Sequence, residues 1–504
     1  MQDLKEKTIR GGAARLASQL ASLALRMGAL FVLARLLGPK DFGLVGMVTA
    51  FTNVLTVFRD FGLSAAAVQR SDITTDQHST LFWINVLFGA LLALVTLAVA
   101  PAIARFYHEP RLLPVAAVVG TAFLFNAVGI QHSALLQRQM RFTSMAVIGV
   151  ASLAVGTAIA IGGAAIGYGY WALVASSVTT PLVASIGFWL ATGWVPGMPR
   201  WRTGIRSMVH FGATVTLNEI IFYIATNADK MMIGRSLGVD AIGVYGRASQ
   251  LLAIPTGALD SAVGEVAFSA LSRLQNDPAR FRSYFLKGCS FVLGLTLPVT
   301  VACSLFADDI VLVLLGPKWQ ASAEVVRLLA PTIAVMAVMS PMKWLTSSLG
   351  LVRRSLKITL VFAPILIVGC FLGVAHGVWG VAFAYSAVMS LWVVPHIAWC
   401  VHGTPISFRD VAAAVLRPLA CGAAAGGGAY VARLMCGDLL SPFPRLVLET
   451  GVLTVTFFAL LIFVAGQKAL YVDLLRGLIG RRSVEDHAET GVKLAANGYA
   501  PEAG

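Results

Sequence analysis

Hydrogen-bonding and charged side chains interrupt an otherwise apolar stretch near the middle of the chain, and they recur every three or four residues. The members of this stripe are Thr216, Glu219, Tyr223, Thr226 and Lys230, with Asn218, Asn227 and Asp229 beside them. Residues with this spacing lie on one side of a helix. Polar groups at membrane depth usually face an aqueous cavity. We therefore expect a cavity-lining stripe with Glu219 at mid-depth, although a structural network of Asp229 with Lys230 would also explain it.

A second polar face lies near the N-terminus, where Arg15, Gln19, Ser22 and Arg26 follow one another at helical spacing. Arg15 lies near the end of an apolar stretch, so its side chain is expected to extend to the membrane surface. Arg26 lies too deep for that, and we expect it to face the cavity. Further charges expected near this space are Arg247, Glu265, Arg327 and Lys343.

Two aspartates, Asp60 and Asp260, each end a stripe of hydroxyl side chains. The stripes consist of Thr49, Thr52 and Thr56 before Asp60, and of Ser249 and Thr256 before Asp260. Because both expected helices run in the same direction, the aspartates should face each other near the inner end. A gate or ion-coupling role and a structural pairing, for example with Arg59, both remain open. Together with Glu219 and Asp229 they are the candidates for ion coupling, since buried carboxylates can carry protons.

Other chemistries lack their sequence signatures. No Gly-rich loop ends in Lys-Ser or Lys-Thr, so we expect no ATP hydrolysis. The six cysteines form no Cys-x-x-Cys pair and the histidines form no spaced cluster, so we predict no metal and no cofactor. No loop exceeds roughly 20 residues, too few for a catalytic domain, and we predict no catalytic residues. The polar start of the chain indicates no cleavable signal peptide.

The elements that must position these residues are membrane-spanning helices. Hydrophobic residues make up 57% of the 504 residues and charged residues 12%, and the mean hydropathy is +0.79. Soluble proteins carry about 25% charged residues, and apolar runs of about 18 residues can cross a bilayer. We predict an all-α polytopic membrane protein with about 14 transmembrane helices. The expected spans are 15–37, 42–66, 80–104, 112–135, 143–165, 168–193, 205–235, 241–268, 284–306, 322–348, 355–375, 377–401, 409–433 and 443–466.

The basic residues indicate how the chain is oriented. The net charge of +14 does not point to nucleic acid, because the charges lie in short loops between apolar spans. Alternate loops carry most of them, from Lys5, Lys7 and Arg10 at the start to Arg481 and Arg482 near the end. Positive charge marks the cytoplasmic side of a membrane protein. Both termini are therefore expected in the cytoplasm.

A segment of about 37 residues occurs twice, 200 residues apart, with roughly a fifth of its positions identical. FVLARLLGPKDFGLVGMV, from Phe31, aligns with MMIGRSLGVDAIGVYGRA, from Met231. Gly38, Gly43 and Gly46 match Gly238, Gly243 and Gly246, and we expect these glycines at tight outer turns.

The two copies are separated by six spans, so they have the same orientation and predict two pseudo-symmetric six-helix lobes with a cavity between them. The expected parts are an N-lobe over 1–194 (spans one to six), a linker over 195–204, a C-lobe over 205–402 (spans seven to twelve), two further spans over 403–466 and a cytoplasmic tail over 467–504, disordered at its end.

The motifs ARLLGPKDFGLVGMV, RDFGLSAAAVQR and NADKMMIGRSLGVDAIGVYGRA resemble those of a known family. They are similar to the polysaccharide and lipid-linked oligosaccharide flippases of the multidrug/oligosaccharidyl-lipid/polysaccharide exporter superfamily, in the branch of the colanic-acid exporters. The likeness extends over most of the chain. Its motifs are fold elements and do not themselves assign substrate contacts.

This resemblance implies a transporter of the bacterial inner membrane, not an enzyme. It would move an undecaprenyl-pyrophosphate-linked oligosaccharide repeat unit outward by alternating access, for exopolysaccharide, lipopolysaccharide or capsule assembly. Expected partners are this substrate and inner-membrane lipids, with a polysaccharide polymerase and co-polymerase as candidates. Guanidinium groups suit a diphosphate because their planar fork forms paired bonds. Our candidate substrate contacts in a cationic cavity are Arg26, Arg35, Lys230, Arg235 and Arg247.

Two rival functions follow from other observations. A cation-coupled multidrug exporter of the same superfamily would favour an acidic cavity, whereas the internal charges of this chain are mainly basic. A membrane-embedded glycan polymerase or ligase would need a large external loop, and none is present. Because Thr226 stands at the place of Arg26 in the repeat, we expect an asymmetric pathway in which the N-lobe holds more of the phosphate.

Overall fold

The computed structural model describes the chain except for residues 1, 57–74, 200–205, 437–439 and 467–504. Asp60 therefore lies outside the described residues. The described part is helical and contains no strand, which confirms the all-α prediction. Helices suit a membrane because each one satisfies its own backbone hydrogen bonds. They are α1 (Gln2–Leu36), α2 (Pro39–Thr56), α4 (Thr75–Tyr107), α5 (Leu112–Arg138), α6 (Phe142–Ala165), α7 (Tyr170–Thr192), α8 (Arg206–Arg273), α9 (Pro278–Leu305), α10 (Ala307–Leu314), η1 (Pro317–Trp319), α11 (Ala321–Leu329), α12 (Pro331–Ser348), α13 (Val352–Val374), α14 (Gly377–Val401), α15 (Phe408–Cys436), α16 (Pro442–Ala459) and η3 (Leu460–Val464).

Eleven helical segments within the described residues are long and apolar enough to cross a membrane. The more polar α2 and the two arms of α8 coincide with three further spans that the sequence predicts. The total of about 14 spans itself stays a prediction.

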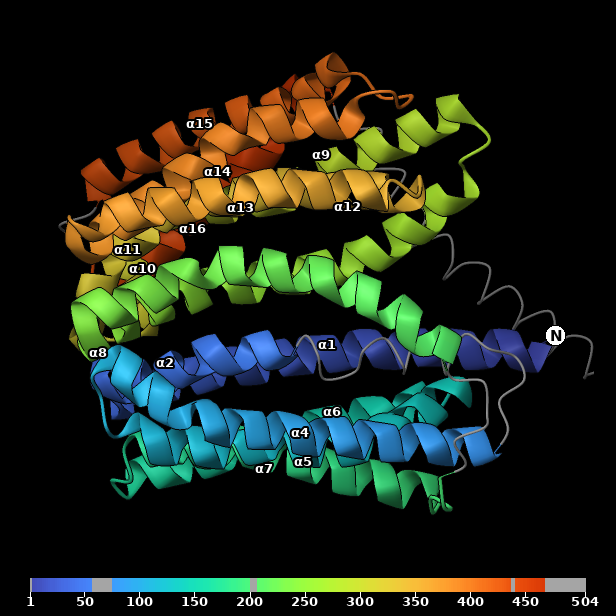
Figure 1. Cartoon of the computed structure of the whole chain (residues 1–504). Coiled ribbons are helices and arrows are strands. Elements are labelled where there is room, and N and C mark those ends of the chain that lie inside the picture. Colours follow the sequence, from blue (N-terminus) through green and yellow to red (C-terminus); the bar gives the residue numbers. More distant parts are fainter. Residues whose placement is uncertain (1, 57–74, 200–205, 437–439, 467–504) are drawn as a thin grey trace, which may run out of the picture.

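Figure 1 shows the helices running roughly along one axis, with α1, α2 and α4–α7 on one side and α9–α16 on the other. We call the first group the N-lobe and α8–α14 the C-lobe. The end of the bundle at which the chain starts is called the N-terminal end. The opposite end, where α1 passes into α2, is called the hairpin end. Buried apolar side chains of both lobes form one continuous core, so the lobes are in direct contact.

Spans seven and eight are two arms of α8, which bends at Gly238. The backbone there has φ 86° and ψ −171°, a conformation that a side chain would disfavour. The matching turn of the first copy is built differently, because α1 ends at Leu36 and Pro39 begins α2. Proline suits the first turn of a helix because it needs no backbone donor. Both copies therefore form helical hairpins, through different local chemistry.

The tenth expected span consists of two helices, α11 and α12, placed end to end over residues 321–348. The sequence did not predict the short helix α10, which precedes them. It begins with two acidic residues, Asp308 and Asp309, where the positive end of a helix favours negative charge.

Buried charges fasten the last two helices to the C-lobe. Asp309 of α10 accepts hydrogen bonds from Arg445 of α16, and Arg433 of α15 donates to the carbonyl of Leu305 at 3.0 Å. Glu449 of α16 is fully buried, 3.8 Å from Arg433. The cluster contains two arginines and two carboxylates, so it is neutral when all four ionise. A neutral, paired cluster lowers the cost of burying charge.

Candidate functional site

The repeated glycines bring the two lobes together at the hairpin end. A Cβ atom at Gly43 would overlap the backbone of Val239, and one at Gly243 would overlap the backbone of Pro39. The contact is reciprocal, as the duplication requires if a pseudo-twofold axis passes between α2 and α8. We call the contact between residues 39–47 and 239–247 the hairpin seam. It closes the space between the lobes at this end.

Arg35, a predicted substrate contact, lies beside this seam. Its guanidinium donates to the carbonyls of Val313 (2.8 Å) and Leu314 (3.2 Å) at the end of α10. A cation is stabilised there because the last carbonyls of a helix carry partial negative charge. The neighbouring Trp319 donates through its indole nitrogen to Ala34 at 2.7 Å. These bonds join α1 of the N-lobe to α10 and η1 of the C-lobe.

Arg235 and Arg247 also reach across the seam. Arg235 contacts Nδ1 of His108 at 3.2 Å and is exposed. Arg247 is buried, and its guanidinium lies 3.2 Å from the centre of the Phe42 ring. An arginine over an aromatic face is stabilised by the negative face of the ring. The structure thus brings Arg35, Arg235 and Arg247 to one contact between the lobes, at the hairpin end.

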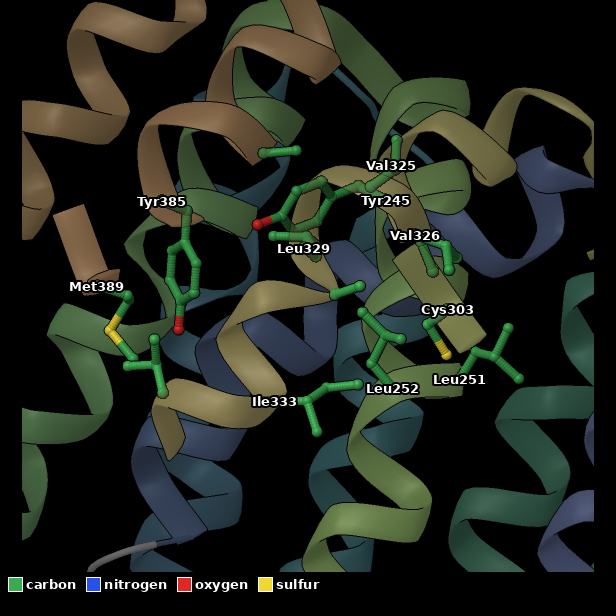
Figure 2. Close-up of a cluster of buried hydrophobic side chains, with 14 of the residues drawn as sticks. Tyr245, Leu251, Leu252, Cys303, Val325, Val326, Leu329, Ile333, Tyr385 and Met389 are labelled. Atoms are coloured by element: carbon green, nitrogen blue, oxygen red, sulfur yellow. The ribbon is translucent and has the colours of Figure 1, made fainter. Parts of the chain in front are cut away.

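A cavity of about 730 Å³ lies next to the seam, within the C-lobe. Its lining comes from α8, α9, α11, α12, α13 and α14. It begins near Tyr245 and Tyr385 and reaches Lys343, Ser355 and Cys400 in the parts of α12, α13 and α14 that lie toward the N-terminal end. Figure 2 shows Tyr245 and Tyr385 in one cluster of buried side chains with Leu329 and Ile333, and all four line the cavity. All lining residues fall between 222 and 400.

The end of the cavity next to the seam holds a network around Asp229. Its carboxylate accepts hydrogen bonds from the Tyr245 hydroxyl (2.6 Å) and from the backbone nitrogen of Lys230 (2.7 Å). The Lys230 ammonium donates to the side-chain oxygen of Asn227 at 2.9 Å. Asp229 is 4% exposed, yet both Asp229 and Lys230 line the cavity. The site therefore offers one cation and one hydrogen-bonded carboxylate at the end next to the seam.

The structure describes only part of the remaining predicted residues. Arg26 is exposed on α1. Glu219 and Asp260 lie on the two arms of α8, and their side chains fall outside the described residues, as Asp60 does altogether. The expectation that the N-lobe holds more of the phosphate stays a prediction. Within the described residues, no three His, Cys, Asp or Glu side chains could share a metal ion.

Sequence reasoning selected Asp229, Lys230 and Arg247 but not Tyr245, although the repeat carried a signal for Tyr245 as well. Asp229, Lys230, Tyr245 and Arg247 stand where the first copy has Ala29, Leu30, Val45 and Met47. Polar groups that one copy alone retains in a membrane point to a function of that copy. The differences between the copies therefore locate the polar site in the C-lobe.

Known proteins resemble this chain in sequence and in fold. The model of the polysaccharide biosynthesis protein family matches residues 32–324. The lipopolysaccharide biosynthesis protein WzxC of Escherichia coli (strain K12) is 26% identical over 74% of this chain and 77% of its own length. The succinoglycan biosynthesis transport protein ExoT of Rhizobium meliloti (strain 1021) is 25% identical over 62% of this chain, and the match spans only 63% of that protein.

A solved structure of the lipid II flippase MurJ, in an inward closed conformation, has a similar fold. The TM-score is 0.71 over 93% of this chain and 100% of that chain, at 14% sequence identity. An identity this low supports the fold alone. The family match extends over more than half of the chain, and the chain therefore belongs to the polysaccharide biosynthesis protein family.

Proposed function

We propose that this chain moves a lipid-linked oligosaccharide repeat unit, carried on undecaprenyl pyrophosphate, across the bacterial inner membrane. Both termini lie in the cytoplasm in this proposal, and the lobes alternate between two open states without catalysing a reaction. The names of its relatives support the substrate class, since one belongs to lipopolysaccharide biosynthesis and another to succinoglycan transport. The fold is that of a lipid II flippase.

One observation carries the proposal, namely a large cavity behind a closed seam. The cavity extends from the hairpin seam toward the N-terminal end, whereas the seam joins the lobes at the other end. A carrier that works by alternating access needs such a state, with a site reachable from one side and blocked on the other. Opening the seam would complete the cycle.

We assign the anionic headgroup to Lys230, which lines the cavity. Its ammonium already has a hydrogen-bonded partner in Asn227, and it retains two further donors. Lys343 lines the other part of the cavity and adds a second positive charge. Hydroxyl and amide groups between them, such as Ser249 and Gln250, suit sugar hydroxyls. Arg26 stays our candidate for the N-lobe side of the path.

Arg35 and Arg235 receive a different role in this proposal. Their guanidinium groups are engaged with backbone carbonyls or His108 at the seam. We propose that they stabilise the closed seam and bind substrate only after it opens. Arg247 has a contact of each kind. It packs on Phe42 at the seam, and it donates a hydrogen bond to Gln250, which lines the cavity.

Ion coupling is assigned first of all to the buried Asp229, with Glu219, Asp60 and Asp260 as further candidates. Moving one charge through 100 mV supplies about 2.3 kcal/mol. Transport in proteoliposomes should therefore respond to an imposed pH or ion gradient, and the Asp229→Asn protein should lose that response. A wild-type rate that ignores every gradient would remove coupling from the proposal.

The central test measures transport directly. Purified protein is reconstituted with a lipid-linked oligosaccharide, and outward movement is followed by the access of an added glycosidase to the sugar. We expect Lys230→Gln to slow transport about 10- to 150-fold, since a hydrogen bond to a charged group contributes about 1.5–3 kcal/mol. Lys230→Arg should retain most of the transport rate. Lys287→Gln, at an exposed lysine of α9 that does not line the cavity, is the matched control. Equal rates for both glutamine variants would overturn the assignment of Lys230.

A further inference from the structure

Unpaired buried polar atoms gather between α4 and α5 of the N-lobe. Of the buried side-chain nitrogen and oxygen atoms that lack a hydrogen-bond partner among the described residues, half belong to four side chains of this interface. They are Nδ1 of His78, both amide atoms of Asn85, both amide atoms of Gln131 and Nε2 of His132. Asn85 and Gln131 are 1% and 0% exposed. The proposed transport cavity does not include them.

The register of the two helices brings these groups together. α4 and α5 are antiparallel, and Gly89 packs against Phe123 and Ala127 while Phe82 lies 6.0 Å from the His132 ring. Between these two contacts, Asn85 of α4 falls opposite Gln131 of α5. This register places the two amides near each other across the interface, and Gln131 directly precedes His132 in the chain.

The surroundings limit the size of what can bind there. At one end a Cβ at Gly89 would lie 2.9 Å from the Phe123 carbonyl, so the helices are in close contact. At the other end His132 stacks on Trp189 at 4.4 Å and contacts the Thr192 hydroxyl at 2.8 Å. The distance along α4 from Gly89 to Phe82 is about 10 Å. This short stretch between two close contacts limits a bound molecule to the size of water and leaves no room for a sugar.

The chemistry of the unpaired atoms also selects the ligand. A cation would satisfy the two amide oxygens and leave the amide nitrogens unpaired, and an anion would do the reverse. A molecule that both donates and accepts serves all of them. Leaving so many buried polar atoms unsatisfied would offset a large part of the net stability of a folded domain. Water is the small molecule that meets these demands, with about three hydrogen bonds each.

We propose that the N-lobe contains a water-binding site between α4 and α5, in which about two or three bound waters join the amides of Asn85 and Gln131 to the imidazole of His132. The site is distinct from the transport cavity, and its test does not depend on transport. It places bound water inside the N-lobe, at a position where the packing of purely apolar helices would exclude water.

X-ray radiolysis tests the site, because bound water produces hydroxyl radicals that label adjacent side chains even where bulk solvent has no access. In the purified full-length protein, Phe82 (4% exposed) should be labelled several times faster than Phe362 (2% exposed) of the C-lobe. Equal labelling of both would overturn the proposal and indicate a dry interface in which the two amides bind each other.

Two substitutions complete the test. Asn85→Leu and Gln131→Met each remove one amide, and each should lower the thermal unfolding temperature, because waters and the other amide lose partners. The double variant should recover most of that loss, since apolar replacement of both partners is nearly neutral, and labelling of Phe82 should fall to the rate of Phe362. Fast labelling that persists in a folded double variant would place the water elsewhere and refute this site.

Discussion

Replacing Gly43 by alanine tests the hairpin seam at its closest point. The added methyl carbon would lie 2.8 Å from Cγ1 and 2.9 Å from the carbonyl carbon of Val239, and it would overlap the carbonyl oxygen. Carbon atoms at rest are about 3.5–4.0 Å apart, so α2 and α8 must separate by about 1 Å. Overpacking of this kind costs about 1–3 kcal/mol. The closed seam should then lose about 5- to 150-fold in population relative to an open one.

Cross-linking reports the closed seam directly. Lys40 and Asp240 lie on opposite sides of it, with 3.9 Å between the ammonium nitrogen and a carboxylate oxygen. Cysteines at these two positions should be joined rapidly by a short bifunctional reagent in the parent protein and slowly in the Gly43→Ala background. Transport of the lipid-linked substrate should fall in parallel, because one of the two alternating states is disfavoured.

The repeat supplies its own controls. Gly243→Ala should reproduce the effect of Gly43→Ala from the other lobe, because its methyl would lie 2.7 Å from the carbonyl carbon of Pro39. Gly46→Ala should change neither cross-linking nor transport, since the nearest atom to its methyl would be 3.9 Å away. Unchanged cross-linking in both Gly43→Ala and Gly243→Ala would refute the reasoning, because the closed seam would then accept the added methyl group without a loss of free energy.

Three further substitutions test other contacts, each by thermal unfolding in detergent. Tyr245→Phe removes the hydroxyl that donates to Asp229 and should lower the free energy of unfolding by about 1.5–3 kcal/mol; an unchanged value would mean that another donor replaces it. Trp319→Phe keeps an aromatic ring but loses the bond to α1, at a cost of about 1 kcal/mol, and a neutral result would show that this bond adds nothing. Arg433→Met removes the cation that lies 3.8 Å from the Glu449 carboxylate and should cost about 3–5 kcal/mol, most of which the added change Glu449→Leu should restore. Failure of that second change to restore stability would contradict the pairing.

Much of the fold was predictable because it depends on local properties of the chain. Apolar runs select membrane helices wherever they occur, since an unpaired backbone is costly in lipid. The duplication located both helical hairpins, and Gly238 indeed has a backbone conformation that favours glycine. The short helix α10 escaped prediction because its eight residues are too few to separate from the neighbouring apolar spans.

The candidate site was only partly predictable, because it depends on which helix faces meet. Lys230 and Asp229 were selected by their spacing on α8, and both line the cavity. Arg35 was selected by its charge and type, yet its partners are carbonyls 278 and 279 residues further along the chain. Tyr245 carried a signal only in comparison with Val45, its counterpart in the first copy.

The sequence by itself determined that this is a duplicated helical membrane protein of the polysaccharide biosynthesis family, and it determined where the hairpins turn. These properties follow from hydropathy, charge and glycine positions, which act over a few residues at a time. Only the tertiary structure decided that Gly43 and Gly243 close one end of the bundle and that the described cavity lies within the C-lobe. The physical reason is that the rotation and register of each helix are set by packing against segments far away in the chain.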